Sequence, residues 1–156
     1  METINYATKR YPKLNDSWVM KELNDVIDID RVSNPAAAAH LMKSIFTKLD
    51  MQKEHFFSIS VDTKNKIKSV DLISMGSLNA NIAHPREIFY AAIAHRAASI
   101  ITCHNHPSGD PNPSQQDVDI VKKLTEAGRI IGIEHMDHVI YGGEKWLSMK
   151  EQDLLR

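Results

Sequence analysis

A short apolar segment, Ser99–Cys103, leads directly into a polar loop that contains two histidines, three prolines and one glycine. Side chains two positions apart on an extended chain point to the same face, so His104 and His106 share one side with Thr102. Cys103 points the other way, into the core, and is not expected to be a ligand. The prolines and the glycine turn the chain back toward the end of the strand. The segment therefore predicts a buried strand, a tight loop and a helix, with two imidazoles at their junction.

The helix after this loop is predicted to begin at Ser114, to run to about Ala127 and to stop at Gly128, because glycine often ends helices. Its first residues, Ser-Gln-Gln-Asp, fit a capping box, in which the side chains of Ser114 and Asp117 each bond to the backbone of the other. On this interpretation the two residues serve only to start the helix.

Asp117 has a second property that a capping role does not require. It is in register with three apolar positions of the same helix, Ile120, Val121 and Leu124. Its carboxylate is therefore expected to face inward, which is costly unless the group is paired or bound to a metal. Two imidazoles and one carboxylate are a sufficient set for a catalytic zinc site, which keeps its fourth position open for water.

The same residues carry a family resemblance. The pattern His-x-His-Pro-x-Gly from His104, followed by Ser-x-x-Asp from Ser114, resembles the JAMM signature of the MPN+/JAB metalloprotease superfamily. Three further segments make the chain similar to the RadC branch, Gly76-Ser77-Leu78-Asn79, His84-Pro85-Arg86-Glu87 and Asp137-His138. The similarity covers roughly residues 34–150. Typical full-length RadC proteins also carry an N-terminal helix-hairpin-helix region, which is not expected here, so the chain resembles the stand-alone RadC-like JAB domain.

This resemblance implies a fold and an activity. The expected fold is a single α/β domain of the JAB/MPN type, which is cytidine deaminase-like, with a mixed β-sheet flanked by helices and a zinc site at a strand end. The implied activity is zinc-dependent hydrolysis of an amide bond in a peptide or isopeptide. The implied cofactor is Zn²⁺, and the implied partner is a peptide or protein substrate.

The resemblance also assigns roles to residues. His104, His106 and Asp117 match the zinc ligands, and Ser114 matches the serine that hydrogen-bonds the developing oxyanion. Glu54 matches the upstream glutamate that acts as general base in the superfamily.

Glu54 has a competitor for the role of base. It lies in a polar run, Met-Gln-Lys-Glu, where a glutamate is normally solvated. Glu87 falls in the first turn of a second predicted helix, where an acid interacts favourably with the helix dipole. Arg86 is expected to form a structural salt bridge, and His84 to start this helix. Asp137-His138 is interpreted as fixing a strand end, with a role beside the metal ligands as the alternative.

The remaining elements follow from periodicity. Asn34-Pro35 predicts a helix start, and apolar residues at spacings of three and four extend this helix to about Leu49. Alternation predicts a strand over 55–62 and a return strand over 66–78, and this hairpin is expected to offer an edge for pairing. A helix over 85–98 is apolar almost all round and is expected to pack between layers. Strands are predicted at 130–133, at 138–141 and around Trp146.

Residues 1–33 are polar and weakly patterned, in contrast to the domain predicted over 34–156. They are expected to form an arm that docks through Trp18, or else a mobile leader.

Composition narrows the function classes. The formal net charge of −1 does not favour a general nucleic-acid binder, which must neutralise phosphates. The single cysteine excludes an internal disulfide. No signal peptide or membrane span is expected, so the predicted location is cytoplasmic. Two alternatives stay open: a DNA-repair-associated factor with a structural zinc, and a protein-interaction module. The substrate and the oligomeric state are not predicted.

Overall fold

Five strands form one mixed sheet in the computed structural model, which describes residues 29–76 and 83–155. The strands are β1 (Glu54–Val61), β2 (Ile67–Gly76), β3 (Ser99–Asn105), β4 (Glu134–Tyr141) and β5 (Trp146–Ser148). Their order across the sheet is β2-β1-β3-β4-β5. The neighbours β3 and β4 are parallel, and the other three neighbouring pairs are antiparallel.

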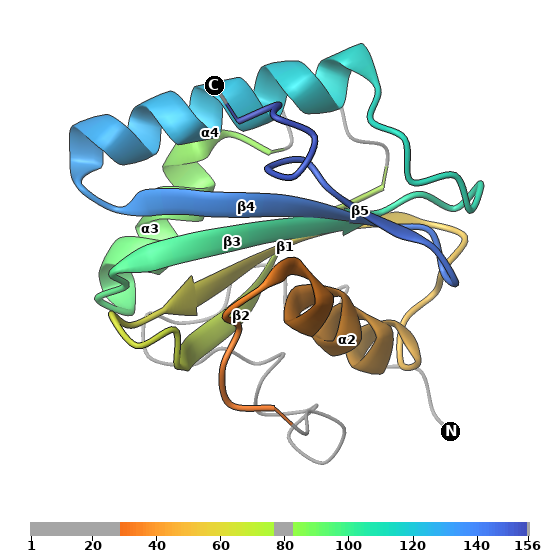
Figure 1. The fold of residues 1–156 in the computed structure, drawn as a ribbon, viewed down its shortest axis with the longest axis horizontal. Coiled ribbons are helices and arrows are strands. Elements are labelled where there is room, and N and C mark those ends of the chain that lie inside the picture. The colour runs from red at the N-terminus through yellow and green to blue at the C-terminus, as the bar shows by residue number, and fades with distance from the viewer. Residues whose placement is uncertain (1–28, 77–82, 156) are drawn as a thin grey trace.

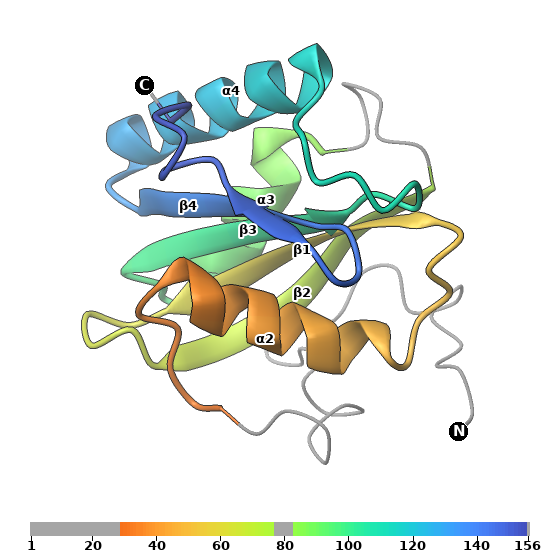
Figure 2. The same cartoon turned by 45° about the vertical axis from the view of Figure 1, so that its right-hand side comes forward.

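Three helices cover the sheet on both faces, which gives a three-layer α/β domain (Figures 1 and 2). On one face lies α2 (Pro35–Phe46), and on the other lie α3 (Pro85–Ala94) and α4 (Gln115–Ile131). Alternation along β1 supplies both layers: Phe57 and Ile59 pack beneath α2, whereas Phe56 packs beneath α3 and α4. The predicted mixed sheet flanked by helices is confirmed.

The helix α2 begins where the sequence predicts. The side chain of Asn34 accepts a hydrogen bond from the backbone N–H of Ala37 at 2.8 Å, and Pro35 occupies the first helical position. Its buried stripe includes Leu41, Met42 and Ile45, all fully buried. Burial of each such side chain contributes about 1.5–3 kcal/mol, so α2 is held mainly by the sheet beneath it.

The helix α4 is longer than predicted. Gly128 lies inside it. Glycine is needed at this position because a Cβ there would sit 2.5 Å from the carbonyl oxygen of Ile133. The helix instead ends at Gly132, whose φ of 85° is the left-handed conformation that favours glycine. The strand predicted at 130–133 is therefore wrong, since Ile130 and Ile131 are helical. The next strand, β4, runs unbroken over 134–141.

The predicted hairpin does offer an edge, and β2 forms it, because β1 is paired on both sides. One prediction about exposure is wrong. The helix α3 lies at the surface rather than between layers, with the side chains of Tyr90 and Ile93 more than half exposed. An apolar sequence alone cannot distinguish a surface helix from an enclosed one.

The predicted N-terminal arm is described only in its last part. Trp18 lies outside the described residues, as do the segment 77–79 and the last two residues of the predicted return strand. Val32 is buried in the core beneath α2. The carbonyl of Asp30 accepts a hydrogen bond from the N–H of Ile67 at 2.8 Å, so this stretch lies against the turn between β1 and β2.

Candidate metal centre

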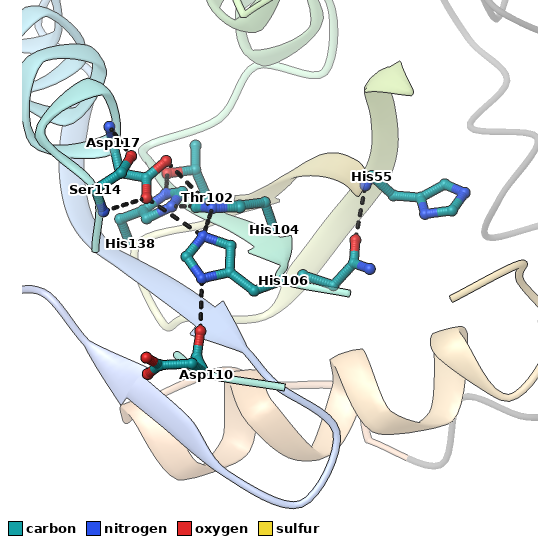
Figure 3. Close-up of polar contacts among 9 residues, drawn as sticks. His55, Thr102, His104, His106, Asp110, Ser114, Asp117 and His138 are labelled. Carbon is teal, nitrogen blue, oxygen red and sulfur yellow. Dashed lines mark hydrogen bonds and ion pairs between the residues drawn. The ribbon is translucent and has the colours of Figure 1, made fainter. Parts of the chain in front are cut away.

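The loop between β3 and α4 brings two distant elements together. His104 lies near the end of β3, and Asp117 lies in the first turn of α4, the helix that crosses to the parallel strand β4. The carboxyl end of β3 and the N-terminus of α4 therefore meet at one edge of the sheet (Figure 3). This is the edge at which α/β folds place their ligands.

His104, His106 and Asp117 converge there, as the sequence predicts. The Nε2 atoms of the two histidines are 2.9 Å apart. The Asp117 oxygens lie 3.4 Å from Nε2 of His104 and 3.3 Å from Nε2 of His106. Three atoms held at about 2.0–2.2 Å by one tetrahedral ion would lie roughly 3.3–3.6 Å apart. Among the residues at 29–76 and 83–155, these three form a group that could hold a metal ion, and the donor set fits Zn²⁺.

The ring of His106 is held in the tautomer that a metal ligand requires. Its Nδ1 lies 2.7 Å from the carbonyl oxygen of Asp110, which can only accept a hydrogen bond. Nδ1 therefore carries the proton and donates, and the lone pair of Nε2 points at the cluster. The loop turns back as predicted, and this turn brings the carbonyl of Asp110 to the ring of His106.

Asp117 takes part in both structures that the sequence left open. Its carboxylate accepts from the backbone N–H of Ser114 at 2.7 Å, and its own N–H donates to Ser114 Oγ at 3.1 Å. The capping box is therefore present. The same carboxylate is only 5% exposed and faces both histidines, so the cap orients the acid toward the cluster.

The electrostatics of the cluster favour an ionised acid. Burial alone would raise the pKa of Asp117. When the two rings also carry protons at Nε2, their hydrogen bonds and the charge of His104 lower the pKa of Asp117 far below its usual range. The carboxylate of Asp117 raises the pKa of His106 in turn, against desolvation, and the charge of Glu54 adds to this effect.

The two candidate bases occupy different environments. In the antiparallel pairing of β1 with β3, Phe56 lies opposite His104. Glu54 is two residues earlier on the same face of β1, which places it toward His106. Glu87 instead forms an ion pair with Arg86 at 3.4 Å on the exposed start of α3, the salt bridge expected for Arg86.

Asn105, which the sequence analysis did not single out, holds the segment around Glu54. Its Oδ1 accepts from the N–H of His55 at 2.7 Å, and its Nδ2 donates to the carbonyl of Lys53 at 3.0 Å. These two hydrogen bonds bracket the backbone of Glu54. The position of Asn105 between His104 and His106 could have indicated this role, because its side chain must point to the other face of the strand.

Asp137 and His138 have separate roles. Asp137 accepts from Ser148 Oγ at 2.6 Å and from the N–H of Lys150 at 3.0 Å, which fixes a strand end as predicted. His138 instead contacts the cluster directly, since its Nε2 lies 2.7 Å from Nδ1 of His104. His84 caps α3 through Nδ1, which accepts from the N–H of Arg86, as expected of a helix-start residue.

Several known UPF0758 proteins are similar to this chain. A UPF0758 protein of Moorella thermoacetica is 47% identical over 124 residues, which are 80% of this chain and 53% of that protein. A UPF0758 protein of Geobacillus sp. (strain WCH70) is 55% identical over 102 residues, or 65% of this chain and 45% of that protein. A UPF0758 protein of Methanococcoides burtonii is 50% identical over 103 residues, which are 66% of this chain and 45% of that protein. The chain thus spans about half the length of the curated relatives it matches.

None of the helices in the described ranges is long and apolar enough to cross a membrane. The family model of the RadC-like JAB domain matches residues 32–154, which include β1 to β5, all three helices and the whole cluster. By this match and by its similarity to the UPF0758 proteins, the chain belongs to the RadC-like JAB domain family.

Proposed function

We propose that this protein is a Zn²⁺-dependent hydrolase that cleaves an amide bond in a peptide or isopeptide. The observation that carries the proposal is the convergence of two imidazole nitrogens and one carboxylate within 4.8 Å of one another. His104, His106 and Asp117 would hold the ion. Membership of the JAB family, whose fold is compatible with metallopeptidases, supports this assignment.

When bound, Zn²⁺ would supply Lewis acidity, lowering the pKa of a water to about 7 and polarising the substrate carbonyl. Glu54 is assigned as the general base that takes the proton of this water and later delivers it to the leaving amine. The charge of Glu54 acts on His106, which places the carboxylate within electrostatic reach of the cluster. Asn105 holds the backbone on both sides of this glutamate.

Ser114 is assigned as a donor to the developing oxyanion. Its Oγ accepts the N–H of Asp117 through a lone pair, so its hydroxyl proton is still able to donate. A donor aimed at developing charge is among the larger contributions to catalysis. The capping role and the catalytic role of this hydroxyl are therefore compatible.

The metal content of protein purified without chelator or added metal tests the proposal. We expect one zinc per chain in the wild type, and none in the double variant His104→Ala/His106→Ala. A matched double variant, His40→Ala/His84→Ala, removes the same number of histidines outside the cluster and should retain the zinc. One equivalent of zinc in the cluster variant would contradict the assignment.

Cleavage of peptide and isopeptide libraries tests the activity. Hydrolysis should be lost on treatment with a chelator and restored by Zn²⁺. Hydrolysis that survives complete removal of metal would exclude the proposed mechanism.

A further inference from the structure

Beyond the cluster, a chain of buried hydrogen bonds runs from His104 along the face of the sheet beneath α4. Nδ1 of His104 lies 2.7 Å from Nε2 of His138, whose Nδ1 lies 2.6 Å from Thr102 Oγ1. That hydroxyl lies 2.8 Å from Nε2 of His135, whose Nδ1 lies 3.0 Å from Oγ1 of Thr125 in α4. Figure 3 shows the first part of this chain behind the cluster.

The rings of His138 and His135 are buried, and burial disfavours the charged form of an imidazole. A neutral imidazole has one N–H donor and one nitrogen acceptor, and a threonine hydroxyl has one proton. The bond between His104 and His138 therefore has two possible directions, and each direction fixes which nitrogen of His138 carries the proton that faces Thr102 or His104. Thr102 has one proton but two lone pairs, so it can accept from His138 and donate to His135.

Only one of these directions suits a metal ligand. If Nδ1 of His104 donates to His138, then Nε2 of His104 presents a lone pair to the cluster. His138 then donates from Nδ1 to Thr102, and Thr102 donates to Nε2 of His135. In the opposite direction the proton of His104 sits on Nε2 and blocks the metal position.

The end of the chain is compatible with the first direction. It requires Nδ1 of His135 to donate to Thr125, so that the threonine oxygen accepts. Thr125 lies inside α4, where a threonine hydroxyl can donate to a carbonyl one turn earlier and still accept through its oxygen.

We propose that His138, Thr102 and His135 are positioning residues, which hold His104 in the tautomer whose Nε2 lone pair faces Asp117 and His106. The inference rests on the proposed metal site. It adds Thr102 and His135, which the family resemblance does not include, and it assigns a role to His138, which the resemblance does include. Hydrogen bonds to the far nitrogen of a ligating histidine orient the ring and raise its basicity, and their loss typically lowers metal affinity 10–100-fold.

The test measures the zinc affinity of the full chain by competition with a chromophoric chelator. His138→Leu removes the acceptor for His104 and should weaken zinc binding by about 10–100-fold. His138→Gln can still accept through its amide oxygen and should retain most of the affinity. Thr102→Val breaks the next link and should fall between the wild type and His138→Leu.

His55→Leu is the matched control, because His55 is a fully buried histidine on the opposite face of the sheet. It should destabilise the fold without changing the zinc affinity of the folded protein. If His138→Leu binds zinc as tightly as the wild type, the positioning role is wrong. If the wild type itself fails to bind one equivalent, the proposed metal site is wrong, and the positioning role with it.

A second measurement on the zinc-loaded wild type does not depend on a variant that must fold. Long-range ¹H–¹⁵N spectra of the histidine rings report which nitrogen carries the proton. We expect His138 and His135 to be protonated at Nδ1. Protonation of His138 at Nε2 would reverse its bond to His104 and overturn the proposal, and protonation of His135 at Nε2 would overturn the role of His135.

Discussion

The two faces of the sheet bury different kinds of side chain. Beneath α2 the central strand residues are apolar, among them Phe57, Ile59, Ile101, Cys103 and Val139. Beneath α3 and α4 the same strands bury apolar residues such as Phe56 and Ile100, but also polar ones, among them Ser58, Ser60, Asp71, Thr102, His104 and His138. Buried polar groups stabilise a fold only when they are satisfied, whereas apolar packing needs no partner. The α2 face is therefore expected to supply stability, and the opposite face to supply the chemistry.

The largest effect should come from a change on the face beneath α3 and α4. Glu54→Gln should lower the turnover of a cleaved library peptide by about 10²–10⁴-fold, as expected for loss of a general base. The zinc content and the fold should be unchanged, because Glu54 is not assigned as a ligand. Kinetics and metal analysis of the same preparation measure both.

Glu87→Gln is the matched control for this variant. It should leave turnover unchanged and alter the free energy of unfolding by only about 0.3–1 kcal/mol, through the start of α3. If the two variants showed the reverse pattern, the role of base would pass to Glu87.

On the α2 face, a core truncation should affect stability alone. Leu41→Ala should lower the free energy of unfolding by about 2–5 kcal/mol, because this fully buried side chain leaves a cavity. The zinc affinity of the folded protein should not change. Denaturant unfolding and zinc competition check the two expectations, with the exposed Lys43→Ala as a control of little effect. A loss of zinc affinity in Leu41→Ala would show that the faces are not independent.

Ser114 tests whether one residue joins stability to chemistry. Ser114→Ala should lower turnover by about 10²–10³-fold through loss of the oxyanion donor. It should also cost about 0.5–2 kcal/mol of stability through loss of the helix cap. Ser114→Thr keeps the hydroxyl and should preserve both. Normal turnover in a folded, zinc-loaded Ser114→Ala protein would reduce this serine to a cap.

A pH dependence belongs to the polar face beneath α3 and α4. Burial lowers the pKa of His135 to about 4, whereas the unfolded chain takes up this proton near pH 6.5. The unfolded state then binds more protons between these values, so stability falls as the pH falls from about 6.5 to about 4. His135 alone accounts for a loss of roughly 3 kcal/mol over this range.

His135→Gln removes this titration and should give a shallower pH dependence of the free energy of unfolding. Denaturant titrations at several pH values, with chelator present, measure the slope of each protein. Equal slopes for the variant and the wild type would show that His135 does not stay neutral in the folded state.

Features that depend on a few neighbouring residues could be predicted from the sequence. The cap at Asn34, the capping box from Ser114 and the common face of His104 and His106 are such features, because backbone periodicity and side-chain chemistry suffice to infer them. The inward direction of Asp117 followed from helical spacing alone. The family resemblance also rested on local motifs, and the match to the RadC-like JAB domain confirms it.

Features that depend on packing between distant residues could not be predicted from the sequence. The end of α4 was predicted at Gly128, where glycine is needed instead for close contact with the chain near Ile133. Which strand of the predicted hairpin forms the edge was also left open, because it depends on β3, which lies some 40 residues later in the chain and pairs with β1. A residue's neighbours across the fold decide such outcomes, and periodicity carries no information about them.

The hydrogen-bond chain shows the same division within one strand. His135 and His138 are three residues apart, so regular alternation along β4 would place them on opposite faces. The register slips between Ile100 and Ile101, where His135 and Asp137 become successive partners and Met136 is the extra residue. This bulge turns both histidines toward Thr102. The sequence alone determined which residues could form the site. The pairing of β3 with β4 decided that His135 and His138 lie behind it, because a bulge arises only when two strands pair.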